Sequence, residues 1–275
     1  MPDMPSSALK VLETTSRTFY LPIVRLPSGL KEAVISGYLC MRAIDEIEDH
    51  PALDTQTKVI LLQEISLLLQ SQTTVEAFAH ERFAELFKPH AKILPEVTLR
   101  LGEWACYAPQ FIAARIWEAT AAMADRMGHW AKNGFKVVTR SDLDRYTYGV
   151  AGAVGLLLCD IWAWFEELQI HRSKGIQFGR GLQSVNIIRN RAEDLRRGVD
   201  FYPENWSDED MQDYARSNLM EFDEYLQELP ATTFSDFVRI PRALAVATLD
   251  AIAEGREKLT RAEVLKIVSG LEAAG

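Results

Sequence analysis

Two acidic residues four positions apart, Asp45 and Asp49, have the type and spacing best suited to chemistry in this sequence. On a helix they stack on one face, with roughly 6 Å between their Cβ atoms, and Arg42 precedes them by one turn. Like charges at that spacing repel unless a cation lies between them. Magnesium is the natural candidate, because it takes carboxylate oxygens and completes its coordination with water and substrate phosphate. A solvated acidic helix end is the competing interpretation, and the commoner one for an isolated pair.

A second polar stripe lies on the helix expected over residues 175–196. Asn186, Asn190 and Asp194 follow one another at intervals of four, so they form one line along an otherwise core-forming helix. Amide and carboxylate oxygens both serve a hard cation, and Arg189 flanks this stripe. Two helices that each carry such a stripe and an arginine describe a pocket for a metal cluster and a polyanion, which all-α folds build from facing helices.

Helical periodicity runs through nearly every segment, and no run alternates convincingly as a strand. The sequence therefore predicts an all-α domain of roughly ten helices. The expected helices are residues 8–14, 30–49, 55–70, 75–90, one after Pro95, one from Pro109 to about residue 133, 143–167, 175–196, one after Ser207, one with Pro241 near its start and a short terminal one. The expected caps are Asp54, Ser141 with Asp144, Ser207, Thr260 with Glu263, and Gly198 at a C-terminus.

Composition limits the class of protein. The chain has 275 residues, 48% hydrophobic and 25% charged, which is ordinary for a soluble globular protein. No linker, low-complexity tract or repeat divides it, so one domain over residues 1–275 is expected. The net charge of −9 argues against a nucleic-acid partner. An anionic ligand must accordingly be held locally, by metal or by a few arginines.

Cysteine usage and apolar runs indicate the compartment. Cys40, Cys106 and Cys159 fit no metal spacing and cannot all pair, which favours a reducing compartment. The start lacks the features of a signal peptide, so a cytoplasmic protein is expected. The most apolar run, residues 154–165, is short of a bilayer span and contains Asp160. The sequence thus predicts no transmembrane segment.

Five motifs, in order and at family spacing, resemble those of the squalene/phytoene synthase family. They are Ser16-Arg-Thr-Phe19, Tyr38-Leu-x-x-Arg42-Ala-x-Asp45-x-x-Glu48-Asp49, Tyr146-x-x-x-Val150-Ala-Gly152-x-Val-Gly155, Gln183-x-x-Asn186-Ile-Ile-Arg189 and Ile240-Pro-Arg-Ala-Leu-Ala-Val-Ala-Thr-Leu249. The last resembles a helix of the squalene synthases in particular. The resemblance covers the chain from Ser16 to its C-terminus. It implies an all-α isoprenoid-synthase bundle with a central cavity. It also implies an allylic prenyl diphosphate substrate bound through Mg²⁺ and, for most members, head-to-head joining of two such substrates.

The resemblance also assigns roles to matching positions. It implies metal ligands at Asp45, Asp49, Asn186, Asn190 and Asp194. It implies catalytic contacts to the diphosphate or the reaction centre from Arg42, Arg189, Tyr146 and Gln183. It implies substrate-binding positions at Ser16, Thr18, Phe19, Tyr38, Val150 and Gly152. NADPH is left open as a second cofactor. The chain stops soon after the last motif, which counts against NADPH. Peripheral membrane contact for product release also stays open.

Some of these residues have simpler interpretations. Tyr146 could be a core tyrosine whose hydroxyl is satisfied by the protein. The small residues around Gly149, Gly152 and Gly155 indicate close helix packing more often than room for an isoprenoid tail.

Two departures from the family pattern leave three hypotheses. Asn190 stands where members usually carry Asp, and Val199 where they usually carry Arg. A head-to-head synthase is favoured by the family. A divergent enzyme acting on one prenyl diphosphate, as a cyclase, phosphatase or prenyltransferase to a non-isoprenoid acceptor, is favoured by the departures. A non-catalytic scaffold is disfavoured by the retained charges, because an interior charge cluster is costly to keep.

Overall fold

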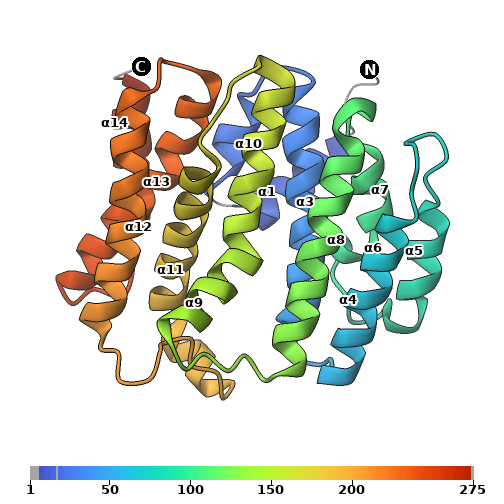
Figure 1. Ribbon diagram of the computed structural model, residues 1–275, viewed down its shortest axis with the longest axis horizontal. Helices are drawn as coiled ribbons and strands as arrows, with labels where there is room; N and C mark the ends of the chain where they lie inside the picture. Colours follow the sequence, from blue (N-terminus) through green and yellow to red (C-terminus); the bar gives the residue numbers. More distant parts are fainter. Residues whose placement is uncertain (1–5, 17, 274–275) are drawn as a thin grey trace. The chain divides into compact units, whose positions relative to one another are not determined.

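The computed structural model describes residues 6–16 and 18–273, and within those ranges it consists of helices and loops alone (Figure 1). The predicted all-α class is confirmed. The chain divides into two compact units, one of Met1–Gly134 with Leu157–Gln169 and the other of Phe135–Leu156 with Ile170–Gly275. The single domain expected over residues 1–275 stays a prediction.

The first unit is built around α3, α4 and α8. Its elements are α1 (Ser6–Thr15), α2 (Tyr20–Val24), α3 (Leu30–Glu48), α4 (Thr55–Gln70), α5 (His80–Phe87), the 3₁₀ turn η1 (Lys88–His90), α6 (Glu96–Leu99), α7 (Leu101–Cys106) and α8 (Gln110–Lys132). Helix α4 packs along α8, and α3 lies against α6, α7 and α8. Gly128 of α8 faces α4, and a Cβ there would make ordinary contact with the side chain of Leu62 at 3.7 Å.

Buried hydrogen bonds fix α3 to α6 and α7. The Ser36 hydroxyl donates to the carbonyl of Trp104 at 2.8 Å, and the Thr98 hydroxyl donates to the carbonyl of Ala43 at 2.9 Å. Ser36 and Ala43 therefore lie on the face of α3 that packs inward. The residues at 42, 45 and 49 fall on a different face because a helix turns by 3.6 residues.

The second unit is built around α11. Its elements are α9 (Arg140–Thr147), the π-helical turn η2 (Tyr148–Gly152), the start of α10 (Ala153–Glu166), α11 (Arg172–Arg196), α12 (Asp208–Glu228), α13 (Thr233–Ala253) and α14 (Arg261–Ala273). Helix α11 packs on α12, on η2 and on α13. Helix α10 begins in this unit and continues along the chain into the first.

Small residues let η2 and α10 approach α11 at backbone distance. A Cβ on Gly155 would stand 2.0 Å from the carbonyl oxygen of Gly175, and one on Gly179 would stand 2.3 Å from that of Ala151. Neither position has room for a side chain. The interpretation of this small-residue run as close helix packing is confirmed.

Several predicted boundaries are also confirmed. Asp54 accepts a hydrogen bond from the backbone N–H of Thr57 at 2.8 Å and so caps α4. Ser207 caps α12, and Thr260 with Glu263 forms the capping pair of α14. Gly198 ends α11 with φ of +81°, the left-handed conformation expected there.

The helix expected from residue 175 begins at Arg172. Two other predicted helix starts were also wrong. The helix expected from residue 75 begins at His80, because the N–H of Ala79 donates to the side chain of Gln72 instead of to the carbonyl of Val75. The helix expected from residue 143 begins at Arg140.

The cap of α9 explains the second of these errors. Ser141 and Asp144 are not the capping pair, because Thr139 and Asp142 bond each other's backbone N–H groups at the start of α9. The π-helical turn that interrupts the same helix was not predicted.

Two further helices differ from expectation. The single helix expected after Pro95 is divided at Arg100, whose ψ of +16° is not helical. Pro241 lies in the interior of α13 and not near its start, because the Thr232 cap begins that helix earlier. The loss of one backbone hydrogen bond at Pro241 is tolerated where Phe237 and Ile240 are buried beside it.

One helical stretch is longer than the sequence indicated. Arg140–Glu166 forms 27 continuous helical residues, and by length and composition alone it is the one such stretch among the described residues that could cross a membrane. The prediction considered residues 154–165 alone and left out the first turns of this helical stretch. Its Asp160 pairs with Arg115 at 2.5 Å, and its Gly155 packs on the backbone of Gly175, which are contacts of a packed core helix. The absence of a transmembrane segment stays a prediction.

Candidate active site

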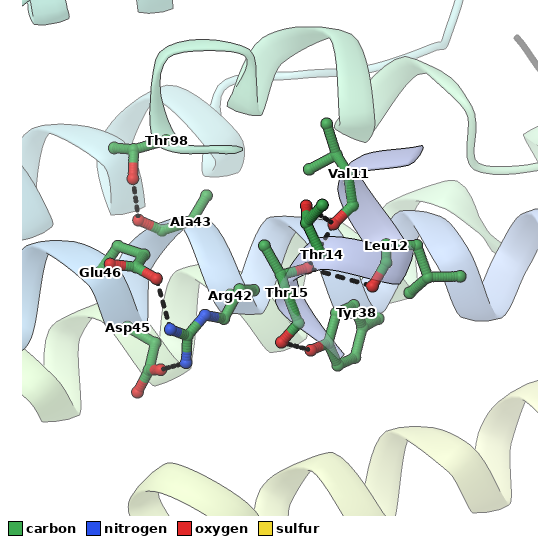
Figure 2. A network of polar contacts seen from close by, with 10 residues as sticks. All are labelled: Val11, Leu12, Thr14, Thr15, Tyr38, Arg42, Ala43, Asp45, Glu46 and Thr98. Carbon is green, nitrogen blue, oxygen red and sulfur yellow. Dashed lines mark hydrogen bonds and ion pairs between the residues drawn. The ribbon is translucent and has the colours of Figure 1, made fainter. Parts of the chain in front are cut away.

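The first acidic motif occupies the last two turns of α3, where Arg42 holds two carboxylates (Figure 2). Its Nη1 donates to Asp45 at 2.6 Å, and its Nη2 bonds the carboxylate of Glu46. The Asp45 side chain is 32% exposed, and Asp49 is exposed at the C-cap of α3. The predicted helical stacking of these residues on one face is therefore what the structure has.

The electrostatics of this motif suit a divalent cation. Burial and the nearby Asp49 raise the pKa of Asp45 to about 7, and the Arg42 guanidinium opposes that rise. The two aspartates thus resist being charged together, which a cation bound between them would relieve. Lys58 lies close by, but its Nζ donates to the backbone carbonyl of Glu48 at 2.6 Å.

The entry motif lies against the same helix. Ser16 is buried, and its hydroxyl accepts the backbone N–H of Phe19 at 3.0 Å, which shapes the turn into α2. The Tyr38 hydroxyl donates to the carbonyl of Thr15 at 2.9 Å (Figure 2). The Tyr38 ring lies 6.4 Å from that of Phe19. Burial raises the pKa of Tyr38. Thr18 is half-buried beside them. The structure therefore brings the entry motif and α3 together, with Tyr38 tying one to the other.

The second motif runs along the last half of α11, and its side chains bond one another. Arg189 donates to the amide oxygens of Asn186 at 2.6 Å and Asn190 at 3.3 Å. The Asn190 amide in turn donates to Asn186 at 3.1 Å. One turn further on, Arg197 pairs with the nearly buried carboxylate of Asp194. The predicted polar stripe exists, and each of its three side chains has an oxygen that accepts a hydrogen bond from an arginine.

Val199 lies in the turn that ends α11. The N–H of Val199 donates to the carbonyl of Asp194 at 3.0 Å, and that of Gly198 donates to Leu195 at 3.0 Å. This pair of bonds, with Gly198 left-handed between them, is a Schellman motif. Only the backbone of Val199 takes part, so the turn does not select its side chain.

The remaining predicted site residues also lie in the second unit. Tyr146 is buried and stacks on Phe201 with ring centroids 4.4 Å apart, as a core tyrosine would. Gln183 is half-buried on α11, one turn before Asn186. Val150 is buried in η2. Gly152 packs on α11, where a Cβ would stand 3.1 Å from Ile176. Their roles toward substrate stay predictions.

A partly buried polar network, not predicted from the sequence, joins α9 to α11 and α12. The Tyr214 hydroxyl donates to Asp144 at 2.6 Å, and Arg180 donates to the backbone carbonyl of Asp144 at 3.1 Å. Burial and this hydrogen bond raise the pKa of Tyr214 to about 12. Arg180 and Asp144 lie 36 residues apart in sequence. This network could have been predicted only if α9 had been expected to pack against α11. The spacing of its residues along the sequence gives no indication that they meet.

The sequence-predicted residues thus form two sets. The entry motif and the first acidic motif lie in the first unit, and the other predicted residues lie in the second. That the two sets form one site stays a prediction. Within the described ranges, no three His, Cys, Asp or Glu side chains come together as a metal site. A metal ion held by Asp45 and Asp49 would accordingly need water or ligand oxygens to complete its coordination shell.

Solved structures share this fold. TcSQS in complex with the ligand BPH1237 matches with a TM-score of 0.71 and 22% identity, over 95% of this chain and 84% of that one. A dehydrosqualene synthase in complex with ligand matches with a TM-score of 0.57 and 16% identity, over 98% of this chain and 95% of that one. The fold is therefore the all-α fold of these synthases.

Sequence comparison identifies the family to which the chain belongs. Residues 12–211 match the model of the squalene/phytoene synthase family, and the chain belongs to that family. The squalene synthase of Schizosaccharomyces pombe is 29% identical over 88% of this chain and 58% of its own length. That of Rattus norvegicus is 26% identical over 88% of this chain and 62% of its own length. The chain therefore spans about three fifths of the length of these relatives.

Proposed function

We propose that this chain ionises an allylic prenyl diphosphate in a Mg²⁺-dependent step and joins two such molecules head to head. The substrates would be farnesyl or geranylgeranyl diphosphate, and the product a squalene- or phytoene-like hydrocarbon. The observation that carries the proposal is the pair Asp45 and Asp49 beside Arg42 at the end of α3, in a member of this family. The relatives that are squalene synthases support the head-to-head step.

The chemistry explains why such residues are needed. Ionisation separates an allylic cation from pyrophosphate, and bound Mg²⁺ supplies positive charge to the leaving group. Asp45 and Asp49 would hold that ion through carboxylate oxygens. Arg42 and Arg189 would donate hydrogen bonds to diphosphate oxygens, where guanidinium groups bind in a fixed geometry. The allylic cation must then be kept from water by apolar side chains.

A second candidate is an enzyme that acts on one prenyl diphosphate, as a cyclase, phosphatase or prenyltransferase to another acceptor. It is favoured by Asn190 and Val199, which remove a negative ligand and a guanidinium from the family pattern. Ionising one diphosphate needs fewer metal and anion contacts than joining two.

Product analysis tests both candidates. The purified protein is incubated with Mg²⁺ and either farnesyl or geranylgeranyl diphosphate, with and without NADPH, and the extract is read by mass. A C30 or C40 hydrocarbon, or its cyclopropyl diphosphate precursor, supports head-to-head joining. A C15 or C20 alcohol or cyclic product supports the second candidate. Diphosphate that is never consumed under any metal condition contradicts both.

The same assay addresses the cofactor. A hydrocarbon that forms only with NADPH would establish the reductant as a second cofactor. We propose the cytoplasm as the compartment, and the free thiols of Cys40, Cys106 and Cys159 support a reducing one. Burial raises the pKa of Cys106 to about 11, which keeps that thiol protonated and unreactive.

A further inference from the structure

The two acidic motifs differ in the charge that they offer to a cation. The first has four carboxylates within five residues, Asp45, Glu46, Glu48 and Asp49, and one guanidinium, that of Arg42, which bonds Asp45 and Glu46. Such a set is strongly negative and suits Mg²⁺, which prefers carboxylate oxygens.

The second motif offers no such excess. Its carboxylates are Glu193 and Asp194, and the guanidinium groups of Arg189 and Arg197 match them one for one. Asn186 and Asn190 add oxygens but no charge. A divalent cation would therefore meet a neutral set, and this second set does not fit a Mg²⁺ site.

The hydrogen bonds of the second motif also argue against a Mg²⁺ site there. Arg189 donates to both amide oxygens, and Arg197 donates to Asp194. A metal ion on this stripe would compete with both arginines for the oxygens that they bond. At the first motif Arg42 likewise competes for Asp45, but the carboxylates there outnumber the guanidinium. An anion would leave those bonds in place, because a guanidinium carries five N–H donors.

The placement of Arg197 completes the argument. The family arginine that follows the glycine is replaced by Val199, whose backbone ends α11. Arg197 lies two residues earlier, on the same turn as Asp194, and its side chain is 40% exposed. Asp194 orients its guanidinium, as a carboxylate orients an arginine at an anion site.

We propose that the second motif of this chain binds diphosphate directly through Arg189 and Arg197 and carries no metal ion of its own. Asn186, Asn190 and Asp194 would then be positioning residues that hold the two guanidinium groups. Divalent ions would be held by the first motif alone. This inference rests on the proposed function only for the identity of the anion.

Metal binding is tested first, with Mn²⁺ as the probe and no anion present. Free Mn²⁺ is measured by electron paramagnetic resonance in the full-length protein. Asp45→Asn should remove the bound Mn²⁺, whereas Asp194→Asn and Asn186→Ala should change its affinity by less than about twofold. Loss of bound Mn²⁺ in either of those two variants would overturn the proposal. Circular dichroism of each variant checks that it is folded.

Anion binding is tested next, with inorganic pyrophosphate in excess EDTA. Removing a charged hydrogen bond should weaken the affinity about tenfold in Arg189→Gln and in Arg197→Gln. Arg197→Lys should retain part of it. Arg196→Gln is the matched control, because it removes the same charge one position away while Arg196 donates only to the carbonyl of Ala192. Equal weakening by the control, or none by either test variant, would overturn the proposal.

Neither measurement requires turnover. A protein that consumes no prenyl diphosphate but shows both binding patterns contradicts the proposed function and leaves this inference standing. A protein that makes hydrocarbon but loses Mn²⁺ in Asp194→Asn contradicts this inference alone.

Discussion

Gly155 lies so close to Gly175 that a Cβ atom on the first would stand 2.0 Å from the carbonyl oxygen of the second. Real Cβ atoms do not approach a backbone oxygen so closely, so the contact requires glycine at position 155. It joins the start of α10 to the start of α11, the helix that carries the second motif. The spacing of these helices is therefore set by backbone and not by interdigitating side chains.

Gly155→Ala should separate α10 from α11 and lower the free energy of unfolding by about 2–4 kcal/mol. Urea unfolding followed by circular dichroism measures the change. Gly270→Ala is the matched control, because Gly270 is helical with nothing within 4 Å of its added Cβ. That control should be neutral or stabilise by up to about 1 kcal/mol. Equal stability of the two variants would contradict the packing argument.

The Asp144 network should show strong coupling. Tyr214→Phe removes a donor from a partly buried carboxylate and should cost about 1–2 kcal/mol of unfolding free energy. In the background of Asp144→Asn the same change should cost less, because the shared hydrogen bond is already weakened. A double-mutant cycle in urea measures the difference. Additive effects of the two changes would show that the bond contributes nothing to stability.

Much of the fold follows from the sequence because its helices carry local signals. Capping residues such as Asp54 and Ser207 begin helices where predicted, and Gly198 ends one. The errors arose where distant partners decide. Gln72 accepts the N–H of Ala79, which a helix starting at residue 75 would donate to the carbonyl of Val75. The π-helical turn depends on contacts with α11, which no local pattern encodes.

The helices and faces of the candidate residues were predicted, but their hydrogen bonds were not. Spacing alone placed Asp45 and Asp49 on one face of α3, and Asn186 and Asn190 along α11. It could not show that Arg197 bonds Asp194, because either member could have turned to other partners. Hydrogen-bond direction and burial are properties of packing, and these decide which stripe is fit to hold a metal.

The raised pKa of Asp45 makes the metal-free protein less stable as the pH rises. The folded state keeps the proton up to about pH 7, whereas the unfolded chain releases it near the ordinary value of 3.8. Between these values the folded state binds more protons, so the free energy of unfolding should fall with increasing pH. The fall should be on the order of 1–3 kcal/mol. Urea unfolding in EDTA at several pH values measures it.

The control for this prediction is Asp45→Asn, which has no proton to lose. Its stability should vary less between pH 4 and pH 7, and at pH 8 it should exceed that of the unaltered chain in EDTA. Mg²⁺ at pH 8 should stabilise the unaltered chain and not the variant. Capping carboxylates such as Asp142 and Glu263, whose pKa lies near 2, titrate below this window. Identical pH profiles for the two proteins would contradict the assignment to Asp45.

Loss of the acidic side chains of the first motif should strongly slow turnover. Asp45→Ala and Asp49→Ala remove carboxylates proposed to hold the divalent ion, and diphosphate release should slow by about 10²-fold or more. Pyrophosphate release measured by a coupled assay at saturating Mg²⁺ checks this. Glu64→Ala, an exposed carboxylate on α4, is the control and should leave the rate unchanged. A rate reduced less than about threefold in both aspartate variants would contradict the assignment.

Restoring the two family residues should change what the second motif binds. Asn190→Asp adds a negative ligand, and Val199→Arg adds a guanidinium where only the backbone is engaged in the turn. Asn190→Asp alone should tighten Mn²⁺ binding and weaken metal-free pyrophosphate binding, because the added carboxylate competes with the anion for Arg189. Val199→Arg alone should tighten pyrophosphate binding by about tenfold without altering the affinity for Mn²⁺.

If the two departures limit head-to-head joining, the double variant should also raise the yield of C30 or C40 hydrocarbon over C15 or C20 alcohol. An unchanged product ratio, together with the expected binding changes, would show that the departures affect anion recognition and not the choice of reaction.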